Sequence, residues 1–197
     1  MKKIIYFFAF ILFVLNTLMI ENCISQWKPD VRLTNYPAIS YTGKSRCIAA
    51  NGNVVHVVWY DRRNSANGDI YYKRSTDAGI SWSADIRLTN DSASSEMPSL
   101  SVSGQFVHVV WHDHRDGNWK IYYKRSTDAG LSWGNDTRMT YDSTLSAMPS
   151  ISVSGQFVHV VWYDERDGND EIYYKRSTDV NFVPNLTNIP LKIDHSC

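Results

Sequence analysis

The stretch STDAGISW at residues 75–82 returns as STDAGLSW at residues 126–133, and it begins a third time as STDV at residues 177–180. The two complete copies are 51 residues apart, since the first ends at Trp82 and the second at Trp133. A sequence that resembles itself at a fixed period is built from supersecondary units that pack on their neighbours. We therefore expect the chain to consist of repeated structural units.

Each repeat contains four short segments that are typical of β-strands. The second copy has PSLSVS at 98–103, QFVHVVWHD at 105–113, KIYYKRS at 120–126 and DTRMT at 136–140. These segments are rich in β-branched and aromatic residues, and no helical periodicity follows residue 25. We therefore predict an all-β chain of about three four-stranded antiparallel β-propeller blades, forming an incomplete or open propeller with repeats at about 45–90, 97–141 and 148–190.

The repeated octapeptide, Ser-x-Asp-x-Gly-x-x-Trp, resembles the Asp-box, or BNR repeat, of sialidase-like β-propellers. The resemblance extends over residues 27–190. It implies that each box forms the turn between the third and fourth strands of a blade, on the side away from the substrate. In the third copy Asn181 and Pro184 replace the glycine and the tryptophan, which predicts a degenerate turn. The box residues with this structural role are Ser75, Asp77, Gly79, Trp82, Ser126, Asp128, Gly130, Trp133, Ser177 and Asp179.

The chemistry of the box fits a turn that holds itself together. An aspartate such as Asp77 or Asp128 can accept hydrogen bonds from backbone N–H groups of its own turn. The glycines can adopt the left-handed conformation, and the tryptophans can cover the turn. We predict that both carboxylates bind backbone within their turns.

A second recurrent pattern, Trp-x-Asp-x-Arg, ends the second strand of each repeat. The residue after each tryptophan is tyrosine or histidine, so these loops offer aromatic, acidic and guanidinium groups that suit a sugar. The alternative is that each Asp/Arg pair is a salt bridge within its blade and that the tryptophans are core. The candidate ligand-binding residues are Tyr60, Asp61, His112, Asp113, Arg115, Tyr163, Asp164 and Arg166.

The resemblance to sialidases also implies a catalytic centre in the first repeat. Arg46 stands at the expected strand start and could pair with a substrate carboxylate, with Arg63 assisting and Asp69 as proton donor. However, Arg46 is followed by Cys47-Ile48 where the family has Ile-Pro, and the later blades of the family are missing. The sequence leaves two functions open: a non-catalytic module that binds glycans or other surfaces, and a sialidase-like exo-glycosidase or a truncated fragment of one.

Composition narrows the possible partners. The 197 residues include 20 basic and 20 acidic side chains without long runs of one sign, so nucleic acid is not expected. Carbohydrate or a glycoconjugate is the expected partner. We expect no cofactor and no metal, since His56, His108 and His159 recur at mid-strand in successive repeats and would lie in separate interfaces.

The first 25 residues resemble a secretory signal peptide. Lys2 and Lys3 precede an apolar run over residues 4–20, and Ser25 offers a small side chain for cleavage, which predicts a secreted or periplasmic chain of residues 26–197. An uncleaved anchor or a lipid on Cys23 are the alternatives. Beyond this segment Cys47 and Cys197 form no disulfide framework, although a bridge between them stays open.

Residues 27–35, WKPDVRLTN, match the end of a box and a fourth strand. An unpaired edge strand is normally covered. We therefore expect an open arc of blades that either pairs head to tail with a second copy or adjoins further blades. A Val31–Thr34 strand paired with Ile172–Lys175 of the same chain would contradict both versions.

Overall fold

The computed structural model describes residues 27–64 and 67–177. The predicted signal peptide, Asp179 and Cys197 therefore lie outside the described residues. Across the described part of the chain, no helix is long and apolar enough to span a membrane. The chain divides into two units, residues 1–35 and 36–197. In the first unit residues 27–35 form no strand, so the predicted strand at Val31–Thr34 is wrong for this structure.

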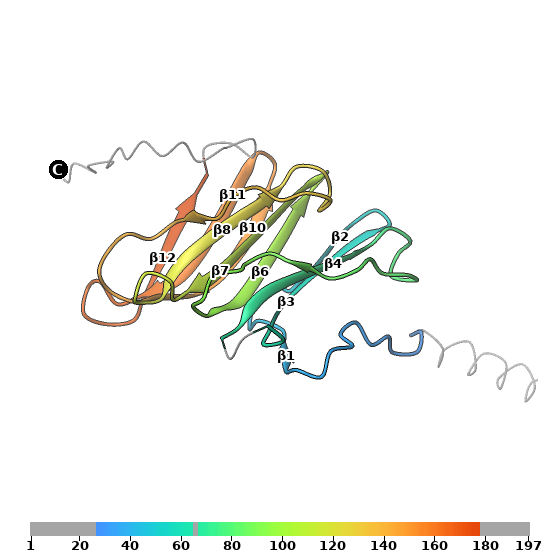
Figure 1. The fold of residues 1–197 in the computed structure, drawn as a ribbon. Helices are drawn as coiled ribbons and strands as arrows, with labels where there is room; N and C mark the ends of the chain where they lie inside the picture. Colours follow the sequence, from blue (N-terminus) through green and yellow to red (C-terminus); the bar gives the residue numbers. More distant parts are fainter. Residues whose placement is uncertain (1–26, 65–66, 178–197) are drawn as a thin grey trace, which may run out of the picture. The chain divides into compact units, whose positions relative to one another are not determined.

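Three antiparallel sheets make up residues 36–177, and the described residues contain no helix (Figure 1). The prediction of an all-β chain with open propeller blades is thus confirmed. The first blade consists of β1 (Ser40–Tyr41), β2 (Ile48–Asn51), β3 (Val54–Asp61), β4 (Asp69–Ser75) and β5 (Ile86–Arg87). The second consists of β6 (Ser95–Ser103), β7 (Phe106–Asp113), β8 (Lys120–Ser126) and β9 (Thr137–Arg138). The third consists of β10 (Ser146–Ser154), β11 (Phe157–Asp164) and β12 (Glu171–Arg176).

Within each blade the strands follow one another as an antiparallel meander. Four strands are present in the second blade, whereas the third has three described strands, and residues 178–197 lie outside the described part of the chain. The register repeats with the sequence: Trp59, Trp111 and Trp162 each lie opposite the first tyrosine of the following strand.

The first blade begins differently from the other two. In the second blade a bulge at residues 97–98 interrupts one continuous strand, and Met97 has a positive φ of 50°. In the first blade residues 42–46 occupy this place and divide the strand into β1 and β2. Cys47 follows this insertion in the position of Ser99, and it is a buried free thiol whose Sγ donates to the Pro98 carbonyl at 3.3 Å.

Each sheet has two faces. We call the face on the side of the next blade in the chain the forward face, and the opposite face the rear face. The forward face of a blade carries the valine before the conserved tryptophan, and the rear face carries the tryptophan itself. Forward residues Val58 and Tyr72 of the first blade share one core with rear residues Val109 and Trp111 of the second. The second and third blades pack in the same way, around Ile121 and its neighbours.

The second blade is therefore covered on both faces, which explains why its second strand is apolar throughout instead of alternating. The first strands of neighbouring blades also lie together. Backbone N–H groups of Ile151 and Val153 donate to the hydroxyls of Ser99 and Ser101 at 3.3 and 3.1 Å. Face-to-face packing around these central strands is the arrangement of propeller blades.

Candidate functional site

The first Asp-box closes the turn between β4 and β5. The Asp77 carboxylate accepts hydrogen bonds from the backbone N–H and the hydroxyl of Ser81, at 2.8 and 2.6 Å. The Ser75 hydroxyl donates to Asp77 and accepts from the Gly79 N–H. Trp82 folds over the turn and donates its Nε1–H to the Gly79 carbonyl at 3.2 Å. Side-chain and backbone groups of the box thus form hydrogen bonds with each other within the turn.

The second box repeats the serine and aspartate bonds, whereas the buried Trp133 Nε1 has no partner among the described residues, and it adds a contact between blades. Asp128 accepts from the Ser132 N–H and hydroxyl, at 2.8 and 2.5 Å. Trp133 packs edge-on against Tyr72 of the first blade, with ring centroids 4.9 Å apart. Gly130 has a φ of +83°, and a Cβ there would collide with the Tyr72 hydroxyl. Glycine is therefore required at this position by conformation and by contact.

Only the start of the third box is described. The Ser177 hydroxyl accepts from the Val158 backbone N–H at 2.9 Å, and the Ser177 N–H donates to the Val158 carbonyl at 2.8 Å. Asp179 lies outside the described residues. The prediction of a degenerate third turn therefore stays a prediction.

Acid is expected to weaken the two complete boxes. Hydrogen bonds from Ser81 and Ser132 lower the pKa of Asp77 and Asp128 to about 2. A carboxylate with a lowered pKa stabilises the fold above its unfolded-state value, near 4, and this stability is lost as the pH falls toward 2. Asp128→Ala should lower the free energy of unfolding by about 1 kcal/mol at pH 7, and the difference from wild type should shrink by pH 2. Urea titrations across this pH range measure it, with Asp30→Ala as an exposed aspartate control outside the boxes; a difference that does not depend on pH would contradict the expectation.

The recurrent Asp/Arg pairs form nearly the same network in each blade. Asp113 is fully buried and accepts from the Ser95 hydroxyl, the Trp111 indole N–H and three N–H groups of Arg115. Arg115 then reaches Asp136 at 2.8 Å and stacks its guanidinium on the Tyr122 ring, 4.5 Å from the centroid. The pKa of Asp113 is lowered, because the hydrogen bonds from Arg115, Trp111 and Ser95 outweigh the effect of burial.

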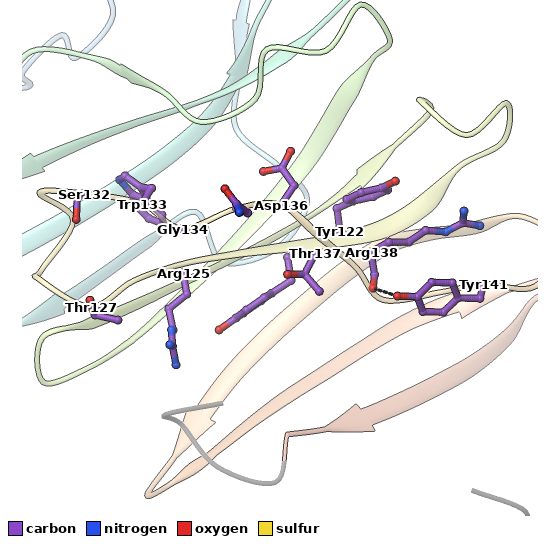
Figure 2. Close-up of a pocket in the computed structure, with 12 residues that line it drawn as sticks. Tyr122, Arg125, Thr127, Ser132, Trp133, Gly134, Asp136, Thr137, Arg138 and Tyr141 are labelled. Carbon is purple, nitrogen blue, oxygen red and sulfur yellow. Dashed lines mark hydrogen bonds between the residues drawn. The ribbon is translucent and has the colours of Figure 1, made fainter. Parts of the chain in front are cut away.

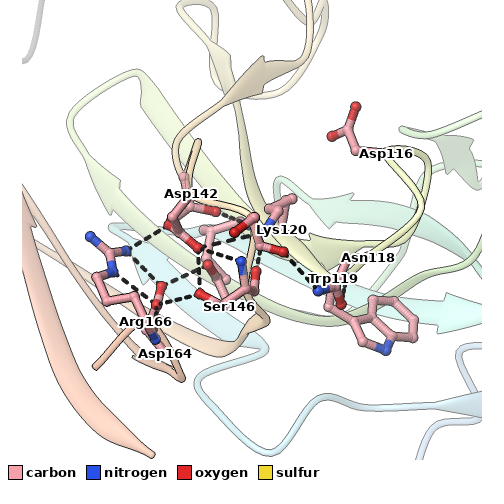
Figure 3. A network of polar contacts seen from close by, with 12 residues as sticks. Asp116, Asn118, Trp119, Lys120, Asp142, Ser146, Asp164 and Arg166 are labelled. Atoms are coloured by element: carbon pink, nitrogen blue, oxygen red, sulfur yellow. Dashed lines mark hydrogen bonds and ion pairs between the residues drawn. The ribbon is translucent and has the colours of Figure 1, made fainter. Parts of the chain in front are cut away.

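The other two blades follow this plan. Asp61 accepts from Ser40, Trp59 and Arg63, and Arg63 also pairs with Asp85 at 2.6 Å. In the third blade Arg166 pairs with Asp164 at 2.6 Å and with Asp142, in the connection between β9 and β10, at 2.9 Å. Figure 3 shows this last cluster, in which Ser146 donates to Asp164 and Lys120 lies beside Asp142.

These pairs thus behave as a structural device in this structure, because Asp61, Asp113 and Asp164 are fully buried with their oxygens engaged. Their burial does not support a position on a ligand-binding rim. The serines that bind these aspartates, and the further aspartates that pair with the arginines, were not predicted from the sequence. Periodicity was the available signal, since Ser95 and Ser146, and likewise Asp85 and Asp136, are 51 residues apart. The partners that were missed are Ser40, Ser95, Ser146, Asp85, Asp136 and Asp142.

The residues proposed for a sialidase centre make the following contacts in the structure. Asp69 is buried and pairs with Arg87 at 2.8 Å, and burial, as the largest influence, raises its pKa. Arg63 is committed to Asp61 and Asp85. Arg46 is exposed, and its backbone carbonyl accepts from Leu100. Asp61 lies directly opposite Asp69 across β3 and β4, so Arg63 and Asp69 share one end of the blade, whereas Arg46 lies by the interior of β3.

The three candidate aromatic residues lie on forward faces. Tyr60 is buried between the first two blades and stacks on Tyr41, with centroids 5.1 Å apart. His112 is buried and accepts weakly from the Met148 N–H at 3.5 Å. Burial lowers its pKa to about 4. Tyr163 is half-buried on the forward face of the third blade.

Trp119, which sequence analysis did not select, forms an aromatic group at the end of the second blade. Its ring stacks on His112 at 4.2 Å and meets the exposed His114 edge-on at 5.1 Å. Trp119 is half-buried, and the neighbouring Asn118 donates to the Ser143 carbonyl (Figure 3). The Nε2 atom of His112 is buried and has no partner among the described residues. A half-exposed indole next to polar side chains is suited to the C–H face of a sugar.

A shallow groove of about 680 Å³ follows β8 and β9 on the outside of the second blade (Figure 2). Arg125, Arg138 and Tyr141 line it, and it ends at the second Asp-box beside Trp133. Tyr141 donates to the Arg138 carbonyl at 2.8 Å. No group of three or more potential metal ligands occurs among the described residues.

No family model and no curated protein sequence matches this chain. Solved structures do resemble it. The Hadza microbial sialidase Hz136 has a TM-score of 0.55 at 15% identity, over 72% of this chain and 36% of that one. Trypanosoma rangeli sialidase in complex with sialic acid has a TM-score of 0.53 at 14% identity, over 78% and 33%.

Penicillium chrysogenum alpha-L-arabinanase complexed with arabinobiose has a TM-score of 0.51 at 17% identity, over 74% of this chain and 47% of that one. At such identities the likeness shows the fold alone, which is that of sialidase-like β-propellers. The chain spans about a third to a half of the length of these three structures.

Proposed function

We propose that this protein is an exported, non-catalytic β-propeller module that binds carbohydrate. The observation that carries the proposal is the state of the three candidate catalytic residues. Arg63 and Asp69 are held in internal ion pairs, and Arg46 is placed away from them along the blade. A general acid must reach the proton acceptor on its substrate, and a fully buried Asp69 does not.

We assign sugar binding to the loop between β7 and β8, around Trp119. This loop belongs to the end of the blade opposite the Asp-box, where the resemblance places the substrate. Trp119 supplies an aromatic face, and His114 supplies an exposed polar group beside it. Two of the similar structures are complexes with sialic acid and with arabinobiose. The proposed export rests on the signal-like sequence of residues 1–25.

A glycan array tests binding, and the protein should be taken from the secreted fraction, where its N-terminus is expected at Gln26. We expect specific carbohydrate binding that weakens about tenfold in Trp119→Ala, the scale of one lost aromatic contact. Leu131→Ala is the matched control, because Leu131 is an exposed apolar residue in the Asp-box turn. Binding equal to wild type in Trp119→Ala would refute the assigned site, and the absence of any glycan binding would refute the function.

The alternative function is a sialidase-like exo-glycosidase. One observation favours it: burial raises the pKa of Asp69, which is the direction that a general acid requires. A fluorogenic sialoside distinguishes the two functions. We expect no turnover; turnover that disappears in both Asp69→Asn and Arg46→Ala would establish the enzyme and overturn the proposal.

A further inference from the structure

The two faces of every blade repeat in sequence, so each blade carries the same pair of packing surfaces. Forward faces place Val58, Val110 and Val161 at equivalent positions, with the isoleucine and second tyrosine of the next strand beside them. Rear faces are also alike in residue type. The rear-face residues are Val55, Val57, Trp59, Tyr71 and Lys73 in the first blade, Val107, Val109, Trp111, Tyr122 and Lys124 in the second, and Val158, Val160, Trp162, Tyr173 and Lys175 in the third.

A forward face therefore recognises a rear face, and the chain shows this contact twice. In the second blade Ile121 is 0% exposed because the third blade covers it. Its counterpart Ile172, on the forward face of the third blade, is 76% exposed, and the neighbouring Tyr174 is 57% exposed. The third blade thus presents an uncovered surface made of the same residue types that are buried at the two junctions between blades.

The complementary surface is partly open on the first blade. Ile48 occupies the rear-face position of Leu100 and Ile151, which are 0% and 2% exposed, yet Ile48 is 58% exposed. Val55 is half-buried. The outer part of this face, at Trp59 and Tyr71, is covered within the chain. The open part is therefore the strip along β2 and the start of β3.

Charged residues of opposite sign lie at one end of each open surface. Glu165 and Asp170 are exposed next to Tyr163 on the third blade. Lys44 and Arg46 are exposed just before Ile48 on the first blade. Within the chain the equivalent contact already carries an ion pair, since Arg62, the counterpart of Glu165, pairs with Glu96 of the following blade at 3.5 Å.

We propose that a second copy of this chain docks head to tail, with the forward face of one third blade on the rear face of the other copy's first blade. Two such junctions close a dimer and cover both open surfaces of each copy. A contact of this kind joins two different patches, so each patch can be tested separately. Exposed apolar surface of this type marks an interaction site.

Light scattering on the full secreted chain tests the proposal. We expect a dimer, and we expect Ile172→Asp and Ile48→Asp each to raise its dissociation constant at least about tenfold, because a buried unpaired carboxylate is costly. Both residues are exposed in the single chain, so neither change should prevent folding, and circular dichroism verifies this. Ile80→Asp is the matched control, since Ile80 is 84% exposed in the first Asp-box turn.

Two results would overturn the proposal. A dimer weakened by Ile172→Asp but unaffected by Ile48→Asp would mean that two forward faces pair with each other. A monomeric wild type would exclude a second copy altogether. Thiol labelling of an Ile172→Cys variant identifies the reason for a monomer: protection from the reagent would indicate that residues 178–197 of the same chain cover the face.

Discussion

Trp111→Ala is expected to lower the free energy of unfolding by about 3–5 kcal/mol, the range for removing a large aromatic side chain from a core. Trp111 is 0% exposed at the junction of the first two blades, packed with Val58 and stacked on Tyr122. Its indole N–H also donates to Asp113 at 2.8 Å. The variant therefore loses packing and leaves a buried carboxylate with one partner fewer.

Denaturant titration followed by circular dichroism measures this change, because tryptophan fluorescence differs between the proteins. The expected loss is a large part of the stability of a typical domain, so Trp111→Ala itself is at risk of not folding. Trp111→Phe keeps the test decisive, since it retains a ring and should lose less than half as much. Trp119→Ala provides a half-buried tryptophan as control. A loss below about 1 kcal/mol in Trp111→Ala would show that the blades do not depend on this junction.

Asp113→Ala should be nearly as damaging, at about 3–5 kcal/mol, the cost of breaking a buried ion pair from one side. Ser95, Trp111 and Arg115 would all lose their acceptor. Arg115 keeps Asp136 as a second partner, which places the expectation at the lower end of this range. Because the pKa of Asp113 is held below its ordinary value, its contribution exists at neutral pH and is lost as acid protonates it.

Two further variants isolate the cause of the Asp113→Ala loss. Adding Arg115→Met should recover part of the stability, because the uncompensated guanidinium is removed. Asp164→Ala in the third blade should cost less, because the Arg166 side chain is 32% exposed against 19% for Arg115. Urea titrations at pH 7 compare these proteins. Equal losses in Asp113→Ala and Asp164→Ala would contradict an explanation based on burial.

The repeat in the sequence determined the elements of the blades and the turns that join them. Strands, their order and the Asp-box turns depend on residues close together in the chain, such as Asp77 and Ser81, so local pattern was sufficient. The split of the first strand at residues 42–46 was not foreseen. It becomes evident only from the pairing of β1 and β2 with different parts of β3. Whether the Asp/Arg pairs are structural or bind a ligand was also left open, because the serines that bond to these aspartates come from another strand.

Burial of a face was decided by tertiary structure alone. The segment IYYKR occurs at residues 121–125 and again at residues 172–176, so its local preferences are the same in both places. Yet Ile121 is 0% exposed and Ile172 is 76% exposed. The hydrophobic effect depends on which surface comes to lie against the side chain, and that neighbour is a different blade, distant in sequence. The sequence therefore determined that both isoleucines belong to a blade face, and only the packing of one blade on the next determined which of them is covered.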